Sequence, residues 1–354
     1  MSLFRGKKNG RRLFPVLTGI AVLSLLPLLP PGTSAEKSVL KSKMFDLSAP
    51  ATELIREKPL HNGTVQQSFA FDNVNGHIYL VQLMSGGQQL PGEPGPVSGA
   101  ERARNGDLAL TKLDLAGNEL GHMFLKGFGH GVQIGVEVTD GTAYLWTETD
   151  AVTEGSDGWG TKLARFRFEN EKVLTPDSPE LEKFSLIEGA DRTTVNIDPA
   201  HGLLTMRYRK NGAFRFAVYD LEEVKRHRYV PIADVPQPAM GTFQGFASYG
   251  GYLYLLEGNA YGSNGSVAPT GNTYITAVNL NTGEVADKQL ITAGSDLSFR
   301  EPEGLAIRLP KINNPHKAEL GIGFASSFPP QRLANIYTID RLLPEQAIKN
   351  SNRP

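Results

Sequence analysis

The sequence predicts an all-β fold, a five-bladed β-propeller of four-stranded antiparallel blades. Three observations indicate it. An apolar strand pattern recurs five times, a glycine turn and a second strand rich in Tyr, Leu and Val follow most copies, and a third strand follows every copy. Short strands that repeat with turn residues between them are typical of propeller blades.

The first strand of each copy starts at an apolar residue or a glycine, and successive starts are 65, 61, 50 and 59 residues apart. We expect these first strands at residues 69–72, 134–137, 195–198, 245–248 and 304–307. The second strands are expected at 77–83, 142–147, 203–209, 252–257 and, after a longer insert, 319–325. Third strands are expected at 108–115, 162–168, 214–221, 273–280 and 333–340, and fourth strands at 119–126, 181–187 and 288–292.

Residues 1–35 resemble a cleaved export signal. Five basic residues precede an apolar run at 13–29, and small residues follow at 33–35. A permanent membrane anchor is less favoured, because Pro27, Pro30 and Pro31 interrupt a run that is short for a bilayer. We therefore expect a secreted protein without stable membrane insertion. The pair Arg11 and Arg12 leaves open whether export is of the general or the twin-arginine type.

The remaining chain is divided into a lead-in at 36–64, one propeller domain at 65–340 and a tail at 341–354. A propeller has to close its ring, so we expect a strand at 43–47 to supply the outer strand of blade five by pairing with 333–340. Residues 51–57 are expected to form two helical turns, and 341–350 a short terminal helix.

Composition excludes several classes of protein. The chain has no cysteine, which excludes a disulfide scaffold. Without the first 35 residues it has 31 basic and 37 acidic residues, so its overall charge does not indicate a nucleic-acid partner. No zinc spacing, phosphate-binding glycine loop or serine elbow is present, and we predict neither a cofactor nor a metal site.

Loop lengths indicate where a ligand would bind. Three loops between second and third strands are long, at 84–106, 148–160 and 258–272, and all three open on the face where the first strands begin. The residue before each strand start is polar in every copy, and alternation directs this set into the central channel. The set is Ser68, Gln133, Thr194, Gln244 and Glu303. It would bind a ligand or hold buried water, and the sequence leaves both open.

Charged residues near the starts of the first strands suggest phosphate binding or acid–base catalysis. Arg192 and Arg300 would bind phosphate, since a guanidinium matches the geometry of phosphate oxygens. Glu301 and Glu303 flank a proline and suit paired acid and base catalysis, with His130 assisting, although His130 between two glycines is also an ordinary turn residue. The acidic residues of 148–157 lack the ordered spacing of a calcium loop, so a solvated loop is favoured over a calcium site.

Several segments resemble a known family. They are 67–72, 121–131, 144–148, 242–245 and 298–304, which include a Gly-His-Gly and a Glu-Pro-Glu-Gly motif. These segments are similar to the secreted teichoic acid biosynthesis protein C family of Gram-positive bacteria, which also includes receptor-binding proteins of staphylococcal phages and, distantly, helveticin J-type bacteriocins. The resemblance spans about 44–340 and implies the five-bladed fold.

Three functions remain open. The first is recognition of a cell-envelope glycopolymer or polyol phosphate, plausibly wall teichoic acid, at the channel mouth. The second is a hydrolase or lyase that cleaves such a polymer with Glu301 or Glu303 as acid and base. The third is a secreted bacteriocin-like toxin, for which the sequence offers no membrane-active amphipathic stretch.

Overall fold

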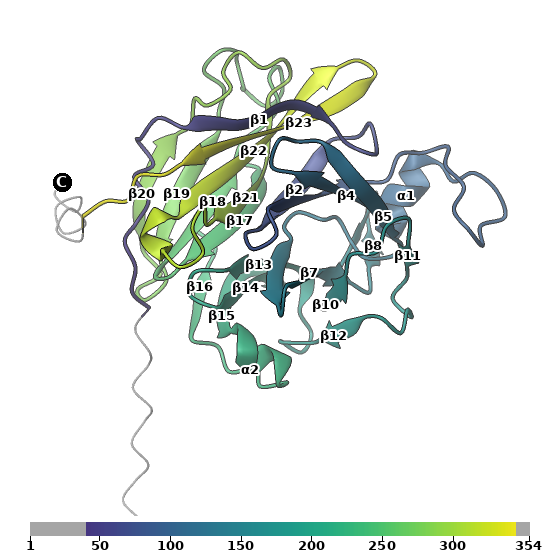
Figure 1. Cartoon of the computed structure of the whole chain (residues 1–354), viewed down its shortest axis with the longest axis horizontal. Helices are drawn as coiled ribbons and strands as arrows, with labels where there is room; N and C mark the ends of the chain where they lie inside the picture. Colours follow the sequence, from purple (N-terminus) through teal and green to yellow (C-terminus); the bar gives the residue numbers. More distant parts are fainter. Residues whose placement is uncertain (1–39, 345–354) are drawn as a thin grey trace, which may run out of the picture. The chain divides into compact units, whose positions relative to one another are not determined.

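Five antiparallel sheets, one per blade, form most of the part of the chain that the structure describes, residues 40–344 of a computed structural model (Figure 1). The expected export signal at 1–35 lies outside the described residues, as does most of the expected terminal helix at 341–350. Among residues 40–344, no helix has the length and apolar character needed to cross a membrane.

The strand order confirms the predicted blades. Blade one contains β2 (Gln66–Asp72), β3 (His77–Leu83), β4 (Leu108–Asp114) and β5 (Glu119–Leu125), with a short parallel strand β11 (Val173–Leu174) beside β5. Blade two contains β6 (Gly135–Thr139), β7 (Thr142–Thr149), β10 (Lys162–Arg167) and β12 (Glu182–Phe184). Blade three contains β13 (Asp191–Asp198), β14 (Leu203–Lys210), β15 (Ala213–Asp220) and β16 (Ala233–Pro236).

Blades four and five follow the same plan. Blade four contains β17 (Phe243–Tyr249), β18 (Tyr252–Glu257), β19 (Tyr274–Asn279) and β20 (Val285–Leu290). Blade five contains β21 (Glu301–Arg308), β22 (Glu319–Phe328) and β23 (Gln331–Ile339), and its outer strand is β1 (Thr52–Pro59). Outside the blades lie the hairpin of β8 (Val152–Glu154) and β9 (Asp157–Trp159), the helices α1 (Gly99–Asn105) and α2 (Leu221–Lys225), and a 3-10 turn η1 (Pro315–Lys317).

The inner strands form a closed ring. Each one contacts the next in the order β2, β6, β13, β17 and β21, and β21 contacts β2 again. Apolar side chains fill the spaces between neighbouring blades; Val81 of blade one and Leu145 of blade two, for example, belong to one buried cluster. Burying one such side chain stabilises the fold by about 1.5–3 kcal/mol, so inter-blade packing is the main cohesive force.

An N-terminal strand closes the ring, as predicted, but the prediction that residues 43–47 form this strand was wrong. β1 pairs with β23, matching Thr52 with Thr338 and Ile55 with Ile336. Residues 43–47 make only an isolated bridge from Phe45 to Leu342. The two helical turns expected at 51–57 were also wrong, because the exposed edge of β23 offers this segment a row of backbone hydrogen-bond partners that an isolated helix lacks.

Glycines let the inner strands meet at the centre. Gly304 has φ +80°, and a Cβ there would lie 2.8 Å from the Cα of Ser68. Gly245 has φ +143°, and a Cβ there would lie 2.7 Å from the Cα of Gly304. Any other residue at these positions would strain the backbone and collide with the neighbouring blade, so these two glycines allow blades four, five and one to approach closely.

Candidate binding site at the mouth of the propeller

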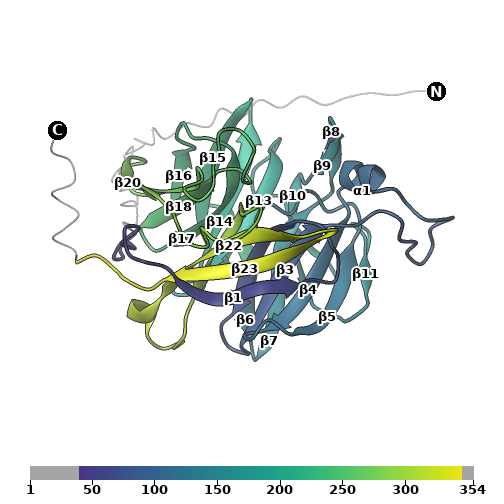
Figure 2. The same cartoon turned by 90° about the horizontal axis from the view of Figure 1, so that it is seen from above.

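We call the end of the ring where the inner strands begin the mouth. The three long loops lie there, and two of them are structured. The loop after β3 carries α1, which contacts the β8–β9 hairpin of the loop after β7 (Figure 2). Arg102 of α1 is fully buried and donates to Asp107 over 2.9 Å, which fixes the first loop from within.

Irregular pairing marks the inner strands at the level of the predicted polar set. The register shifts between Gln66 and Ser68 in blade one, between Asp191 and Thr194 in blade three, between Phe243 and Gly245 in blade four, and between Pro302 and Leu305 in blade five. A bulge gives a strand an extra residue and re-aims its side chains. Four of the five inner strands therefore depart from regular alternation at the mouth.

Three of the five predicted channel residues are buried and hydrogen-bonded to backbone. The hydroxyl of Ser68 donates to the carbonyl of Gly131 over 2.6 Å, and that of Thr194 donates to the carbonyl of Gln133 over 2.7 Å. Each of these bonds joins one blade to its neighbour.

Gln133 spans the centre of the ring. Its amide nitrogen donates to the carbonyl of Leu305 over 2.8 Å, and its amide oxygen accepts from the N–H groups of Phe246 and Leu305. One side chain of blade two thus binds the inner strands of blades four and five. The channel is closed at this level rather than open to a ligand.

Two further predicted residues also bond within the protein. Gln244 is half-buried and donates to the carbonyl of Gly258 over 3.1 Å. Arg300 is fully buried and donates to the carbonyls of Ile291 and Ala293 and to the hydroxyl of Thr273. The Arg300 guanidinium holds the start of blade five against blade four and faces no solvent.

His130 and Arg192 come together at the mouth because both contact Trp159, a tryptophan that sequence reasoning had not selected. The ring of His130 stacks on Trp159 with centroids 4.5 Å apart, and the Arg192 guanidinium lies over Trp159 at 4.1 Å. Arg192 also pairs with Glu154 over 3.1 Å. Burial lowers the pKa of His130, against the opposing effect of Asp157, so the imidazole is neutral at pH 7.

Glu148, at the end of β7, is a buried carboxyl group below this stack. It accepts hydrogen bonds from the backbone N–H groups of His130, Gly131 and Gly160. These bonds favour its charged form, but complete burial outweighs them and raises the pKa of Glu148 to about 7. The carboxyl group of Glu148 therefore holds together two segments of the mouth, the one at His130 and Gly131 and the loop that ends at Gly160.

Arg207 of β14 is the residue that sequence reasoning missed. It is 6% exposed, and its guanidinium lies between the rings of Phe214 and Phe243, at 3.7 and 3.9 Å. Its Nε donates to Gln237 over 2.8 Å, but neither terminal nitrogen has a hydrogen bond or an ion pair within residues 40–344. Burial, with Arg192 nearby, lowers the pKa of Arg207 to about 9, so it stays charged at neutral pH.

A set of acceptor groups lies where blades five and one meet. Glu303 is 4% exposed and Glu301 is half-buried, and neither carboxylate accepts a hydrogen bond from the described residues. Burial raises the pKa of both, and for Glu303 the charge of Glu301 adds to the effect. Gln66, buried beside this strand, has no hydrogen-bond partner among the described residues for either amide atom. These unpaired polar atoms could bind hydroxyl groups.

The acidic residues of 148–157 each have a partner within the protein. Asp150 pairs with Lys162 and Lys183, at 2.7 and 2.6 Å. Glu154 pairs with Arg192 and Arg209, and Asp157 lies 3.6 Å from His130. Their side chains have different partners and do not converge on one point.

A cavity of about 220 Å³ opens at the opposite end of the inner strands. Apolar side chains such as Phe71, Val136 and Ile197 line it. Both carboxylates in its lining already have a partner within the protein: Glu137 pairs with Arg165, and Asp198 pairs with His201. No arginine or lysine of the described residues lines this cavity, whereas Arg192 and Arg207 lie at the mouth, so we place the candidate site for an anion at the mouth.

Comparison with known proteins agrees with this architecture. A Bacillus subtilis (strain 168) protein named "Putative major teichoic acid biosynthesis protein C" is 29% identical over 310 residues, which are 84% of this chain and 64% of that protein. The tail fiber of Staphylococcus aureus phage P68 superposes with a TM-score of 0.63 at 19% identity, over 88% of this chain and 58% of the fiber. The chain thus spans less than two thirds of either relative.

The match to a family covers most of the chain. Residues 65–338 match the family described as "Phage 5-bladed beta propeller receptor binding platform domain". That range runs from the start of β2 to the last residues of β23, so it includes all five inner strands. The chain therefore belongs to this family of phage-type five-bladed receptor-binding platform propellers.

Proposed function

We propose that this propeller recognises an anionic cell-envelope glycopolymer of the wall teichoic acid type at its mouth, outside the cytoplasmic membrane. The Arg207 guanidinium carries the proposal. A buried cation is normally matched by a carboxylate or a ligand, because removing charge from water is unfavourable. The buried carboxyl group of Glu148 is near enough to act on the charge of Arg207, but within residues 40–344 neither terminal nitrogen of Arg207 has a hydrogen-bond or ion-pair partner, so both can donate to a phosphate oxygen.

Arg192 supports the same assignment from the neighbouring strand. It belongs to the His130–Trp159–Arg192 stack, and its charge acts on Arg207. Two like charges held near each other in a partly dry site repel, and an anion bound between them would relieve the repulsion. Trp159 and Phe243 are half-buried, so part of each ring is left to pack against the carbons of a sugar or polyol.

The unpaired acceptors of blades five and one would bind the hydroxyl groups of the same polymer. Glu301, Glu303 and Gln66 begin their inner strands at the same end of the ring as Arg192. Hydroxyl groups can donate to carboxylates and amide oxygens that otherwise have no partner. A polymer of alternating phosphates and polyols has both kinds of group.

The relatives support this class of ligand. The name of the Bacillus subtilis relative refers to teichoic acid biosynthesis, and the family description refers to receptor binding. The first phrase names the class of polymer, and the second names recognition of a receptor.

The test is incubation of the full-length chain with purified wall teichoic acid and, in parallel, with a neutral cell-wall glycan. Retention on the polymer is measured by co-sedimentation and small products by mass spectrometry. We expect retention on the phosphate polymer alone, weakening as salt is added, since salt screens charge pairs. Equal retention on the neutral glycan would contradict an anion-centred site.

Cleavage of the polymer is a second candidate, favoured by the buried Glu303. A carboxyl group with a raised pKa near a second carboxylate is the arrangement that acid–base cleavage uses. If the chain is an enzyme, fragments appear in the same mass-spectrometric assay and disappear with Glu303→Gln, while retention persists. Retention without fragments would exclude this candidate.

A further inference from the structure

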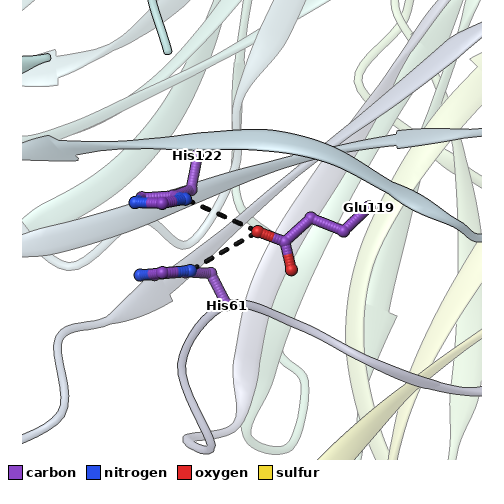
Figure 3. Close-up of side chains that lie close together, drawn as sticks. All are labelled: His61, Glu119 and His122. Carbon is purple, nitrogen blue, oxygen red and sulfur yellow. Dashed lines mark ion pairs between the residues drawn. The ribbon is translucent and has the colours of Figure 1, made fainter. Parts of the chain in front are cut away.

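Two histidines and a glutamate converge on the outside of blade one (Figure 3). His61 belongs to the loop between β1 and β2, and Glu119 and His122 belong to β5. The Nδ1 atoms of His61 and His122 lie 3.4 and 3.5 Å from the same Oε1 of Glu119. The imidazoles are parallel, with centroids 3.3 Å apart and planes 10° apart.

These separations fit ligands of one metal ion better than a hydrogen bond. An N–H···O bond spans about 2.7–3.2 Å. Two ligand atoms bonded at about 2.0–2.2 Å to a tetrahedral ion lie about 3.3–3.6 Å apart. The observed distances fall in the second range. Within residues 40–344, Glu119 has no lysine or arginine partner, and it is the only carboxylate that contacts either imidazole.

A bulge in β5 makes the cluster. Residues three apart in a regular strand point to opposite faces, so Glu119 and His122 would be separated. The register of β4 and β5 shifts here: Leu113 pairs with Glu119, but Lys112 pairs with Gly121. The extra residue, Leu120, changes the phase of alternation and brings both side chains to one face.

His61, the candidate ligand that does not belong to β5, is held in place by the neighbouring strand β4. His122 is opposite Thr111 of β4, and the Thr111 hydroxyl accepts the backbone N–H of His61 over 3.2 Å. The ring of Phe124 lies in T-shaped geometry beside both imidazoles, with its centroid 5.6 Å from that of His61 and 5.5 Å from that of His122. The side chain of Glu119 is 38% exposed, which leaves a side of the cluster open to water.

We propose that His61, Glu119 and His122 form a divalent transition-metal site, with Zn²⁺ as the ion that this ligand set suits best. Two imidazoles, one carboxylate and a water complete a four-coordinate shell. The bound ion joins the chain just after the closing strand β1 to the outer strand of blade one. The ion would therefore link the segment that follows β1, the outer strand of blade five, to blade one.

The experiment uses the full-length chain without a histidine tag, stripped of metal and titrated with Zn²⁺ in a calorimeter. We expect one equivalent to bind and the melting temperature to rise, because a ligand of the folded state stabilises it. Co²⁺ in place of Zn²⁺ should give the intense visible absorption of a four-coordinate site.

Variants locate the site. His61→Ala and Glu119→Gln alter exposed side chains, and each should weaken Zn²⁺ binding about tenfold or more. His77→Ala is the matched control: His77 also lies beside a carboxylate, Asp72 at 3.6 Å, but has no second imidazole. Its Zn²⁺ binding should equal that of the unmodified chain.

Two results would overturn the proposal. One is an unmodified chain that binds no more Zn²⁺ than the His61→Ala variant, and the other is a loss of binding in His77→Ala as large as in His61→Ala. The mouth is not involved, so failure here leaves glycopolymer recognition untouched, and failure of polymer retention leaves the metal site untouched.

Discussion

Glu148 is a buried carboxyl group whose proton contributes to stability. Its pKa is raised from an ordinary 4.5 to about 7 in the folded chain, so between these values the folded state binds the proton more tightly than the unfolded state. Stability from this group is therefore greatest below pH 4.5 and is lost as the pH rises to 7.

Glu148→Gln should remove that pH dependence. The amide also places an NH₂ group against one of the three N–H donors, so we expect a loss of about 1–3 kcal/mol in the free energy of unfolding. Urea unfolding at several pH values measures both effects. Glu154→Gln, at an exposed carboxylate of the same loop, is the control, and an equal change in its pH profile would contradict the role of Glu148.

Gln133 gives a second prediction at the scale of one side chain. Gln133→Ala leaves the N–H groups of Phe246 and Leu305 buried without this acceptor, and we expect a loss of about 3 kcal/mol. Gln244→Ala removes one bond from a half-buried residue and should cost about 1 kcal/mol. Equal losses of unfolding free energy in the two variants would show that Gln133 does not hold the inner strands together at the centre of the ring.

At the scale of one strand, β1 closes the ring, because it completes blade five from the other end of the chain. Ile55 is 3% exposed and packs in the cluster between blades five and one. Ile55→Ala should lower the free energy of unfolding by about 2–5 kcal/mol. Leu120→Ala, at a 48% exposed position, should change it by less than about 0.5 kcal/mol. Denaturant unfolding compares them, and a similar loss in both would contradict closure by β1.

Sequence reasoning predicted the strands that depend on local pattern and missed features that depend on distant partners. Inner strands carry alternation and a following glycine turn, so they were found. Residues 52–59 contain strong helix formers such as Leu54 and Glu57, and only pairing with β23 makes them a strand. The bulge at Leu120 is likewise invisible in the sequence, because it is a matter of register between two strands.

The binding site at the mouth stays a prediction, and the sequence predicted only some of the residues that the structure brings together there. The mouth could be located from loop lengths and from His130 and Arg192. Arg207 could not be found, since its neighbours Phe214 and Phe243 come from two blades. Arg300 was chosen for its charge, but its bonds to Ile291 and Ala293 depend on folded geometry.

At the scale of the whole molecule, we propose that the ring presents Arg207, whose terminal nitrogens have no hydrogen-bond or ion-pair partner among residues 40–344, to a polyanion. Arg207→Met tests it most directly. Methionine retains apolar packing between the two phenylalanines and removes a buried charge, so the melting temperature should stay level or rise. Arg226→Ala removes an exposed arginine and serves as the charge control.

The decisive measurement is the affinity of these two variants and the unmodified chain for purified wall teichoic acid by calorimetry. Loss of a charge-assisted phosphate contact is worth about 1.5–3 kcal/mol, or roughly a tenfold to hundredfold weaker affinity. We predict that loss in Arg207→Met, with affinity unchanged in Arg226→Ala. A folded Arg207→Met protein that binds the polymer as tightly as the unmodified chain would contradict the account.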